Sequence, residues 1–170
     1  ASCTFLSIAL GMTDSNSPLN IPLIDGQPNF ALASFLDQSE LGHRFSVAQN
    51  SKIRRLDEVV AEEVDSLPVG FIKIDVEGWE SKVLAGAKET IEKFHPNFMI
   101  EIWERNLLDI WNLLEPFGYR GHFYFQGEKC DLTQFDPAIH TANENNWNPR
   151  NPDAFENDRY VKDFFFLHES

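Results

Sequence analysis

The chain has 170 residues, 42% of them hydrophobic and 13% aromatic, which fits a globular domain and excludes a disordered chain. Its 14 basic and 27 acidic residues give a net charge of −13 without any Lys/Arg cluster, which excludes nucleic acid as a partner. Two distant cysteines, Cys3 and Cys130, disfavour a disulfide scaffold or a zinc ribbon, and no apolar run suits a membrane span. The start lacks the pattern of a signal peptide. We therefore predict a single cytoplasmic domain over residues 1–170.

The N-terminal part alternates short apolar segments with turn-forming residues. Residues 4–10 predict a strand that Gly11 closes. Asn20 to Ile24 predicts a second strand, and the turn clusters at 13–18 and 25–29 flank it. This arrangement indicates a loosely paired hairpin.

The next segments lead towards the middle of the chain. Residues 30–36 are compatible with either a strand or a helix, and residues 45–49 alternate like a half-buried strand. Residues 56–64 carry apolar side chains at the spacing of one helical face. The segment 65–68, which ends in a proline, then breaks the predicted helix.

The stretch around residue 75 organises the rest of the sequence. Residues 71–74 form an apolar run with one lysine, typical of a buried parallel strand. Asp75 and Glu77 follow the strand, Gly78 turns the chain, and a helical pattern begins at Trp79. Open α/β sheets bind their ligands where such strands end. We therefore predict the active-site edge here.

A strand–helix–strand unit follows from this stretch. The apolar stripe from Trp79 predicts one helix as far as Phe94, and Pro96 ends it. Residues 98–103 predict the next strand. The whole unit spans about 33 residues, as a parallel crossover does.

The C-terminal third is predicted to contain one helix, three strands and a long loop. Asn106 is a candidate N-cap for a helix with an apolar face, and Gly118 a candidate stop. The remaining segments are strands at 122–125, 130–132 and 160–168, and a polar, Asn-rich loop at 136–159.

Asp75 and Glu77 are the first candidate catalytic residues. On an extended chain, residues two apart point the same way, so their carboxylates would be neighbours. Such a pair suits a general base that takes a hydroxyl proton, or the binding of a divalent cation. The alternative for Glu77 is that it caps the helix beginning near Trp79.

Glu101 is the third candidate, because it lies inside the apolar strand 98–102. A carboxylate in such a place is costly unless it is paired. A functional role and an ion pair with a partner such as Lys73, in the adjacent strand, both remain open.

The same stretches carry a family resemblance. Residues 72–80 (Ile-Lys-Ile-Asp-Val-Glu-Gly-Trp-Glu), 83–87 and 99–102 resemble the signature of the FkbM family of S-adenosylmethionine-dependent methyltransferases. Residues 53–59 and 9–11 resemble segments that precede it. The resemblance implies an α/β fold with a Rossmann-like, doubly wound, mainly parallel sheet of the class I methyltransferase type, with a strand order like 3-2-1-4-5-7-6.

The resemblance also implies a reaction, which is methyl transfer from S-adenosylmethionine to a hydroxyl of a small molecule or glycan. In that picture Asp75 lies nearest the reacting groups, and Glu77 and Glu101 assist. The residues implied to border the adenine are Ala9, Leu10 and Gly11. A divalent cation is an optional further cofactor.

One expected feature of this class is missing. No glycine-rich turn joins a strand to a helix, so by comparison with the family the chain starts at the third strand. The strand at 71–74 would then expose an unpaired edge, which predicts a homodimer or a fragment of a longer product. Two rival hypotheses are a non-catalytic binding or scaffold domain and a metal-dependent hydrolase that uses Asp75, Glu77 and Glu101.

Overall fold

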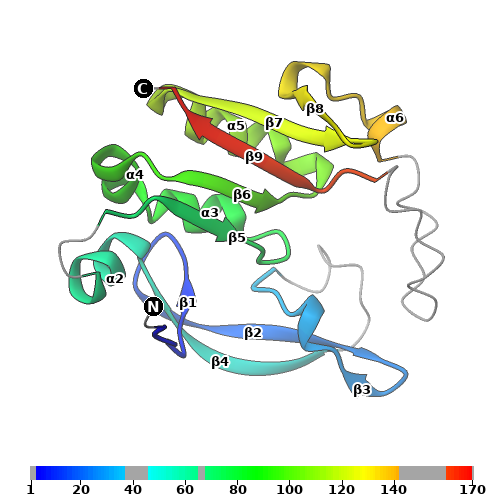
Figure 1. The fold of residues 1–170 in the computed structure, drawn as a ribbon. Coiled ribbons are helices and arrows are strands. Elements are labelled where there is room, and N and C mark those ends of the chain that lie inside the picture. Colours follow the sequence, from blue (N-terminus) through cyan, green and yellow to red (C-terminus); the bar gives the residue numbers. More distant parts are fainter. Residues whose placement is uncertain (1–2, 37–45, 65–67, 142–159, 170) are drawn as a thin grey trace. The chain divides into compact units, whose positions relative to one another are not determined.

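The structure is a computed structural model that describes residues 3–36, 46–64, 68–141 and 160–169. The chain forms two compact units (Figure 1). The first unit comprises residues 1–68 and 76–93, and the second comprises residues 69–75 and 94–170. A single domain over the whole chain stays a prediction. In the described residues no helix is both long and apolar enough to cross a bilayer.

The first unit contains a mixed sheet in the order β1-β4-β2-β3. Its strands are β1 (Ala9–Leu10), β2 (Ser15–Ile24), β3 (Gln27–Pro28) and β4 (Ser46–Arg54). β1 runs parallel to β4, and the other pairs are antiparallel.

The turn predicted at residues 13–18 is largely wrong, because β2 already begins at Ser15 and pairs with β4 along its length. Pro18 is tolerated because β3 pairs with β2 only at Leu23 and Ile24, so proline's missing N–H disturbs no second neighbour. The predicted hairpin turn is confirmed, with φ of 51° at Asp25 and 77° at Gly26.

Helices complete the first unit. Within the segment 30–36, for which a strand and a helix were both open, residues 30–32 form a short 3-10 helix, η1 (Phe30–Leu32), and Ser34 makes an isolated β-bridge with Asn20. The predicted helix at 56–64 is confirmed as α2 (Leu56–Glu63). The single helix predicted from residue 79 to 94 is wrong, because it divides into α3 (Glu80–Ala85) and α4 (Lys88–Phe94).

Asp57 explains the division. Its buried carboxylate accepts hydrogen bonds from the backbone N–H groups of Thr90, at 2.8 Å, and Glu89, at 3.3 Å, at the start of α4. Its own N–H donates to the carbonyl of Gly86, at 3.0 Å. Asp57 of α2 therefore satisfies a free carbonyl group after the end of α3 and two free N–H groups at the start of α4.

The second unit contains a five-stranded mixed sheet in the order β5-β6-β9-β7-β8 (Figure 1). Its strands are β5 (Phe71–Ile74), β6 (Asn97–Glu101), β7 (Tyr119–Phe125), β8 (Glu128–Asp131) and β9 (Asp163–His168). The predicted parallel pairing of β5 and β6 is confirmed. The sheet is mixed, because β9 lies between β6 and β7 in the opposite direction and β8 returns in a hairpin; a mainly parallel, doubly wound arrangement stays a prediction.

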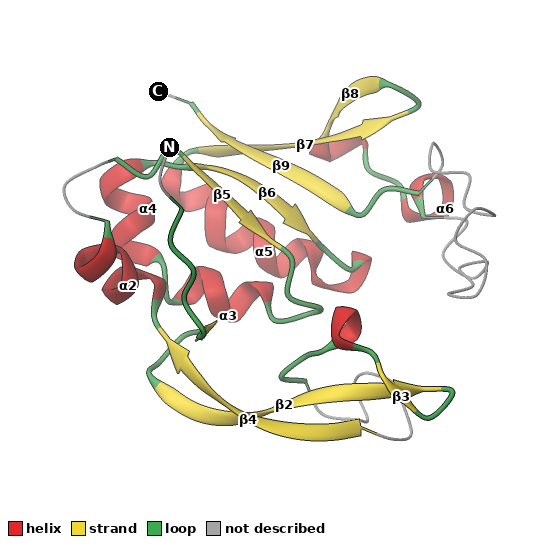
Figure 2. Cartoon of the chain, turned by 60° about the horizontal axis from the view of Figure 1, so that its bottom comes forward, coloured by secondary structure: helices red, strands yellow, loops and turns green. Residues whose placement is uncertain are grey.

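Alternating side chains build the core of this unit. Phe98 pairs with Phe166 and Ile100 with Phe164 across neighbouring strands, and none of the four is exposed. Helix α5 (Leu107–Leu114) lies along one face of the sheet (Figure 2) and buries its apolar side there. Because side chains alternate between the two faces, a shift of one residue would move these buried side chains to the other face, so their burial fixes the register of the sheet.

Short helices surround α5 and β8. They are η2 (Glu104–Asn106), η3 (Glu115–Phe117), η4 (Leu132–Gln134) and α6 (Pro137–His140). Asn106 is the N-cap residue of α5, as predicted, but its side chain makes no capping hydrogen bond. The stop at Gly118 is confirmed by its left-handed φ of 82°. The predicted polar loop at 136–159 contains α6, and its residues 142–159 lie outside the described residues.

Tyr119 makes the stability of the second unit depend on pH. Its hydroxyl is buried and donates to the carbonyl of Pro96 at 2.8 Å, and burial raises its pKa from 10.0 to about 12. The unfolded chain loses this proton first, so the stabilisation is complete below about pH 10 and disappears as pH rises to about 12.

Tyr119→Phe is therefore expected to flatten this alkaline loss of stability. It should also cost about 1 kcal/mol at neutral pH, because the hydrogen bond is lost. Urea unfolding across the alkaline range measures both effects, with the exposed Tyr124→Phe as the control. An unchanged pH profile in Tyr119→Phe would contradict the assignment.

Candidate functional site

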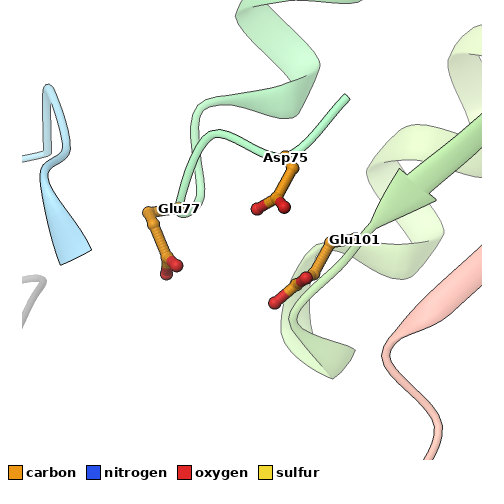
Figure 3. A group of neighbouring side chains, drawn as sticks. All are labelled: Asp75, Glu77 and Glu101. Atoms are coloured by element: carbon orange, nitrogen blue, oxygen red, sulfur yellow. The ribbon is translucent and has the colours of Figure 1, made fainter. Parts of the chain in front are cut away.

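The candidate site lies where the parallel strands β5 and β6 end. Ile74 pairs with Ile100, so Asp75 follows its strand beside Glu101. Paired residues of neighbouring strands face the same side of a sheet, which places both carboxylates together. Figure 3 shows these side chains, and carboxylate oxygens of Asp75 and Glu101 lie within 4.8 Å of each other. The structure thus brings together two of the residues that the sequence predicted.

Glu77 follows Asp75 in a tight turn. Its φ of 49° and the φ of 89° at Gly78 are both left-handed, a conformation that favours glycine at the second position. An oxygen of Glu77 also lies within 4.8 Å of one of Asp75 (Figure 3). The N-cap residue of α3 is Trp79, so Glu77 does not occupy the cap position itself. The carboxylate that accepts the Gly78 N–H, at 2.8 Å, is that of Glu80.

Each carboxylate of the β5–β6 pair is bound by a lysine. Lys73 donates to Asp75 at 3.0 Å, and Lys162 donates to Glu101 at 2.7 Å. The pairing of Lys73 with Glu101, which the sequence analysis considered, is wrong. The register places Lys73 opposite Met99 and on the same side of its own strand as Asp75.

Lys162 is the residue that sequence reasoning missed. Glu101 pairs with Asp163 of β9, so the residue before Asp163 lies next to the end of β6. The backbone of Lys162 also accepts a hydrogen bond from Ile102 at 2.8 Å. No local pattern around residue 162 carries this signal, because it depends on β9 pairing with β6.

The two lysines balance the charge of the pair. The pKa of Lys73 is raised, first by its hydrogen bond to Asp75 and then by the charges of Asp75, Asp163 and Glu101, so it stays an ammonium. The Asp75 side chain remains 40% exposed and can accept a proton from a bound hydroxyl. Three carboxylates are also hard ligands of the kind that divalent cations prefer. Here, however, the ammonium group of Lys73 already contacts one oxygen of Asp75 and that of Lys162 contacts one oxygen of Glu101, and both would compete with a cation.

The residues predicted to border the adenine lie in the first unit, at the end of β1. The N–H of Gly11 donates to the carbonyl of Arg54 at 2.9 Å. A Cβ at Gly11 would lie 2.7 Å from Ile53 Cγ2 and 3.3 Å from Trp79 Nε1. Ala9 and Leu10 precede it in β1 and are half-buried. Gly11 therefore allows close packing of two side chains against the backbone.

Trp79 carries a further feature of this region. Its Nε1 atom is buried and makes no hydrogen bond within the part of the chain that the structure describes. A buried N–H without an acceptor is costly, and an acceptor atom of a ligand would satisfy it. This orphaned donor fits a cofactor with polar ring atoms. The sequence placed Trp79 in the apolar stripe of a helix and gave no sign of this role.

Comparisons with known proteins identify the family. The sequence model described as "Methyltransferase FkbM domain" matches residues 1–120, and no curated protein gave a match. The chain therefore belongs to the family defined by the methyltransferase FkbM domain, as the resemblance predicted.

One solved structure is similar to this chain. It is the crystal structure of methyltransferase FkbM from Methylobacillus flagellatus KT, with 23% sequence identity and a TM-score of 0.42. The similarity covers 69% of this chain and 24% of that protein, so the chain spans about a quarter of the length of that relative.

Proposed function

We propose that this chain is part of a methyltransferase that uses S-adenosylmethionine and methylates a hydroxyl of a small molecule or glycan. The observation that carries the proposal is the Asp75–Glu101 pair, which lies within 4.8 Å at the ends of two parallel strands, inside the match to the family. Ligands of open α/β sheets bind at such strand ends.

The strand order of the second unit supports a Rossmann-like arrangement. Its order β5-β6-β9-β7, with β9 antiparallel, corresponds to the 4-5-7-6 half of the order 3-2-1-4-5-7-6 that the resemblance implies. In that order another strand would add to the outer edge of β5, whose hydrogen-bonded neighbour among the described strands is β6. A homodimer through this edge remains part of the proposal.

The residues of the site have distinct tasks in this reaction. Bound S-adenosylmethionine would supply an electrophilic methyl group. The Asp75 carboxylate accepts the proton of the acceptor hydroxyl as its oxygen becomes methylated. Lys73 orients Asp75, and the Glu101–Lys162 pair holds the neighbouring strand end. The Trp79 N–H, beside Gly11, would donate to the cofactor.

Calorimetric titration with S-adenosylmethionine and S-adenosylhomocysteine tests the proposal. Binding near 1 μM, or about −8 kcal/mol, is expected for both. Trp79→Phe keeps the ring but removes the N–H, and should weaken binding by about 1 kcal/mol, roughly fivefold. No heat of binding at millimolar cofactor would contradict cofactor use by this chain and favour the scaffold alternative.

A further inference from the structure

The second unit contains a cavity of about 410 Å³ beside α5. Leu107 and Trp111 line it from α5, and Leu132 and Phe135 line it from η4 and the residue that follows. Cavities of this volume, with apolar and aromatic walls, are typical small-molecule sites. Asp75, Glu77 and Glu101 are not among its lining residues.

Gly121 shapes one wall of the cavity. A Cβ at Gly121 would lie 2.5 Å from Leu132 Cδ2 and 2.9 Å from Leu132 Cβ. The missing side chain lets Leu132 rest directly on β7, while the capping box of Asp131 and Gln134 fixes η4. The wall is therefore held by local structure before any ligand binds.

Charged groups of the cavity lining are mainly acidic. The lining contains two carboxylates, those of Glu104 and Asp131, and one guanidinium, that of Arg120, which is paired with Glu169 at 3.1 Å. Hydrogen bonds from the Thr133 side chain and backbone lower the pKa of Asp131, so its charge persists into the acid range. Carboxylates next to aromatic rings favour cations over anions.

We propose that this cavity binds a small organic ammonium ion with an apolar body. The apolar body lies between Trp111 and Phe135, and the ammonium group lies towards Glu104 and Asp131. The site is separate from the one assigned to methyl transfer, and it does not depend on that proposed function.

Three size-matched probes test the proposal: phenethylammonium, 2-phenylethanol and phenylacetate. NMR titration of the full chain, followed at the Trp111 indole and Gly121 amide signals, measures each affinity. Phenethylammonium is expected to bind best, about three- to fivefold more tightly than the neutral alcohol, and phenylacetate least well. Equal affinities, no binding at 10 mM, or shifts confined to residues outside the cavity would each overturn the proposal.

Two variants distinguish the contribution of the Glu104 charge to binding from that of the Trp111 ring. Glu104→Gln should remove most of the preference for the cation over the alcohol, and the exposed Glu92→Gln on α4 is the matched control. Trp111→Leu keeps the wall apolar and should weaken the cation more than the alcohol. Thermal unfolding confirms that each variant is folded. An unchanged preference in both Glu104→Gln and Trp111→Leu would refute the assigned orientation.

Discussion

Gly86→Ala is expected to destabilise the first unit by about 3 kcal/mol or more. The φ of Gly86 is −89°, which any residue can adopt, so the effect is steric. A Cβ at this position would overlap the carbonyl oxygen of Gly11 and approach Arg55 Cα to 3.5 Å. Backbone atoms cannot swing aside as a side chain can, so the end of α3 must move away from β1.

Thermal unfolding measures this effect. For a chain of this size, 3 kcal/mol corresponds to a fall in Tm of at least about 6 °C. Gly70→Ala is the matched control, because a Cβ there meets no atom within 4 Å. Its stability should stay within about 0.5 kcal/mol of the wild type. Equal melting temperatures for Gly86→Ala and Gly70→Ala would show that the close approach of Gly11 and Gly86 is wrong.

Asp75→Asn is expected to lower the rate of methyl transfer at least about a hundredfold while leaving the cofactor affinity within about twofold. The amide keeps the size of the side chain and can still accept a hydrogen bond from Lys73, but it cannot take a proton at neutral pH. Release of S-adenosylhomocysteine, with an acceptor on which the wild type is active, measures the rate.

Two further variants serve as a comparison and a control for Asp75→Asn. Glu101→Gln should have a smaller effect, about tenfold, because in the proposed reaction Glu101 orients the strand end through Lys162 and takes no proton. Glu92→Gln, exposed on α4, should retain wild-type turnover. Full activity in Asp75→Asn would remove Asp75 from the chemistry, and equal losses in Asp75→Asn and Glu101→Gln would argue against a proton acceptor at Asp75 alone.

Local sequence patterns predicted a substantial part of the fold and of the site. The apolar run at 71–74, the crossover to the next strand and the acidic turn at Asp75 were all readable, because each depends on side-chain period or on turn-forming residues close together. The family followed from the same stretch. The proximity of Asp75 and Glu101 became visible only with the register of β5 and β6.

The tertiary structure decided the features that depend on distant segments. The insertion of β9 between β6 and β7 makes the second sheet mixed and brings Lys162 to Glu101. The hydrogen bond that the Asp57 carboxylate accepts from the Thr90 N–H helps to divide one amphipathic pattern into two helices. A hydrophobic period records which face of an element is buried, but not which element buries it. The lysine partners of the two carboxylates and the capping of α4 by Asp57 therefore came from packing alone.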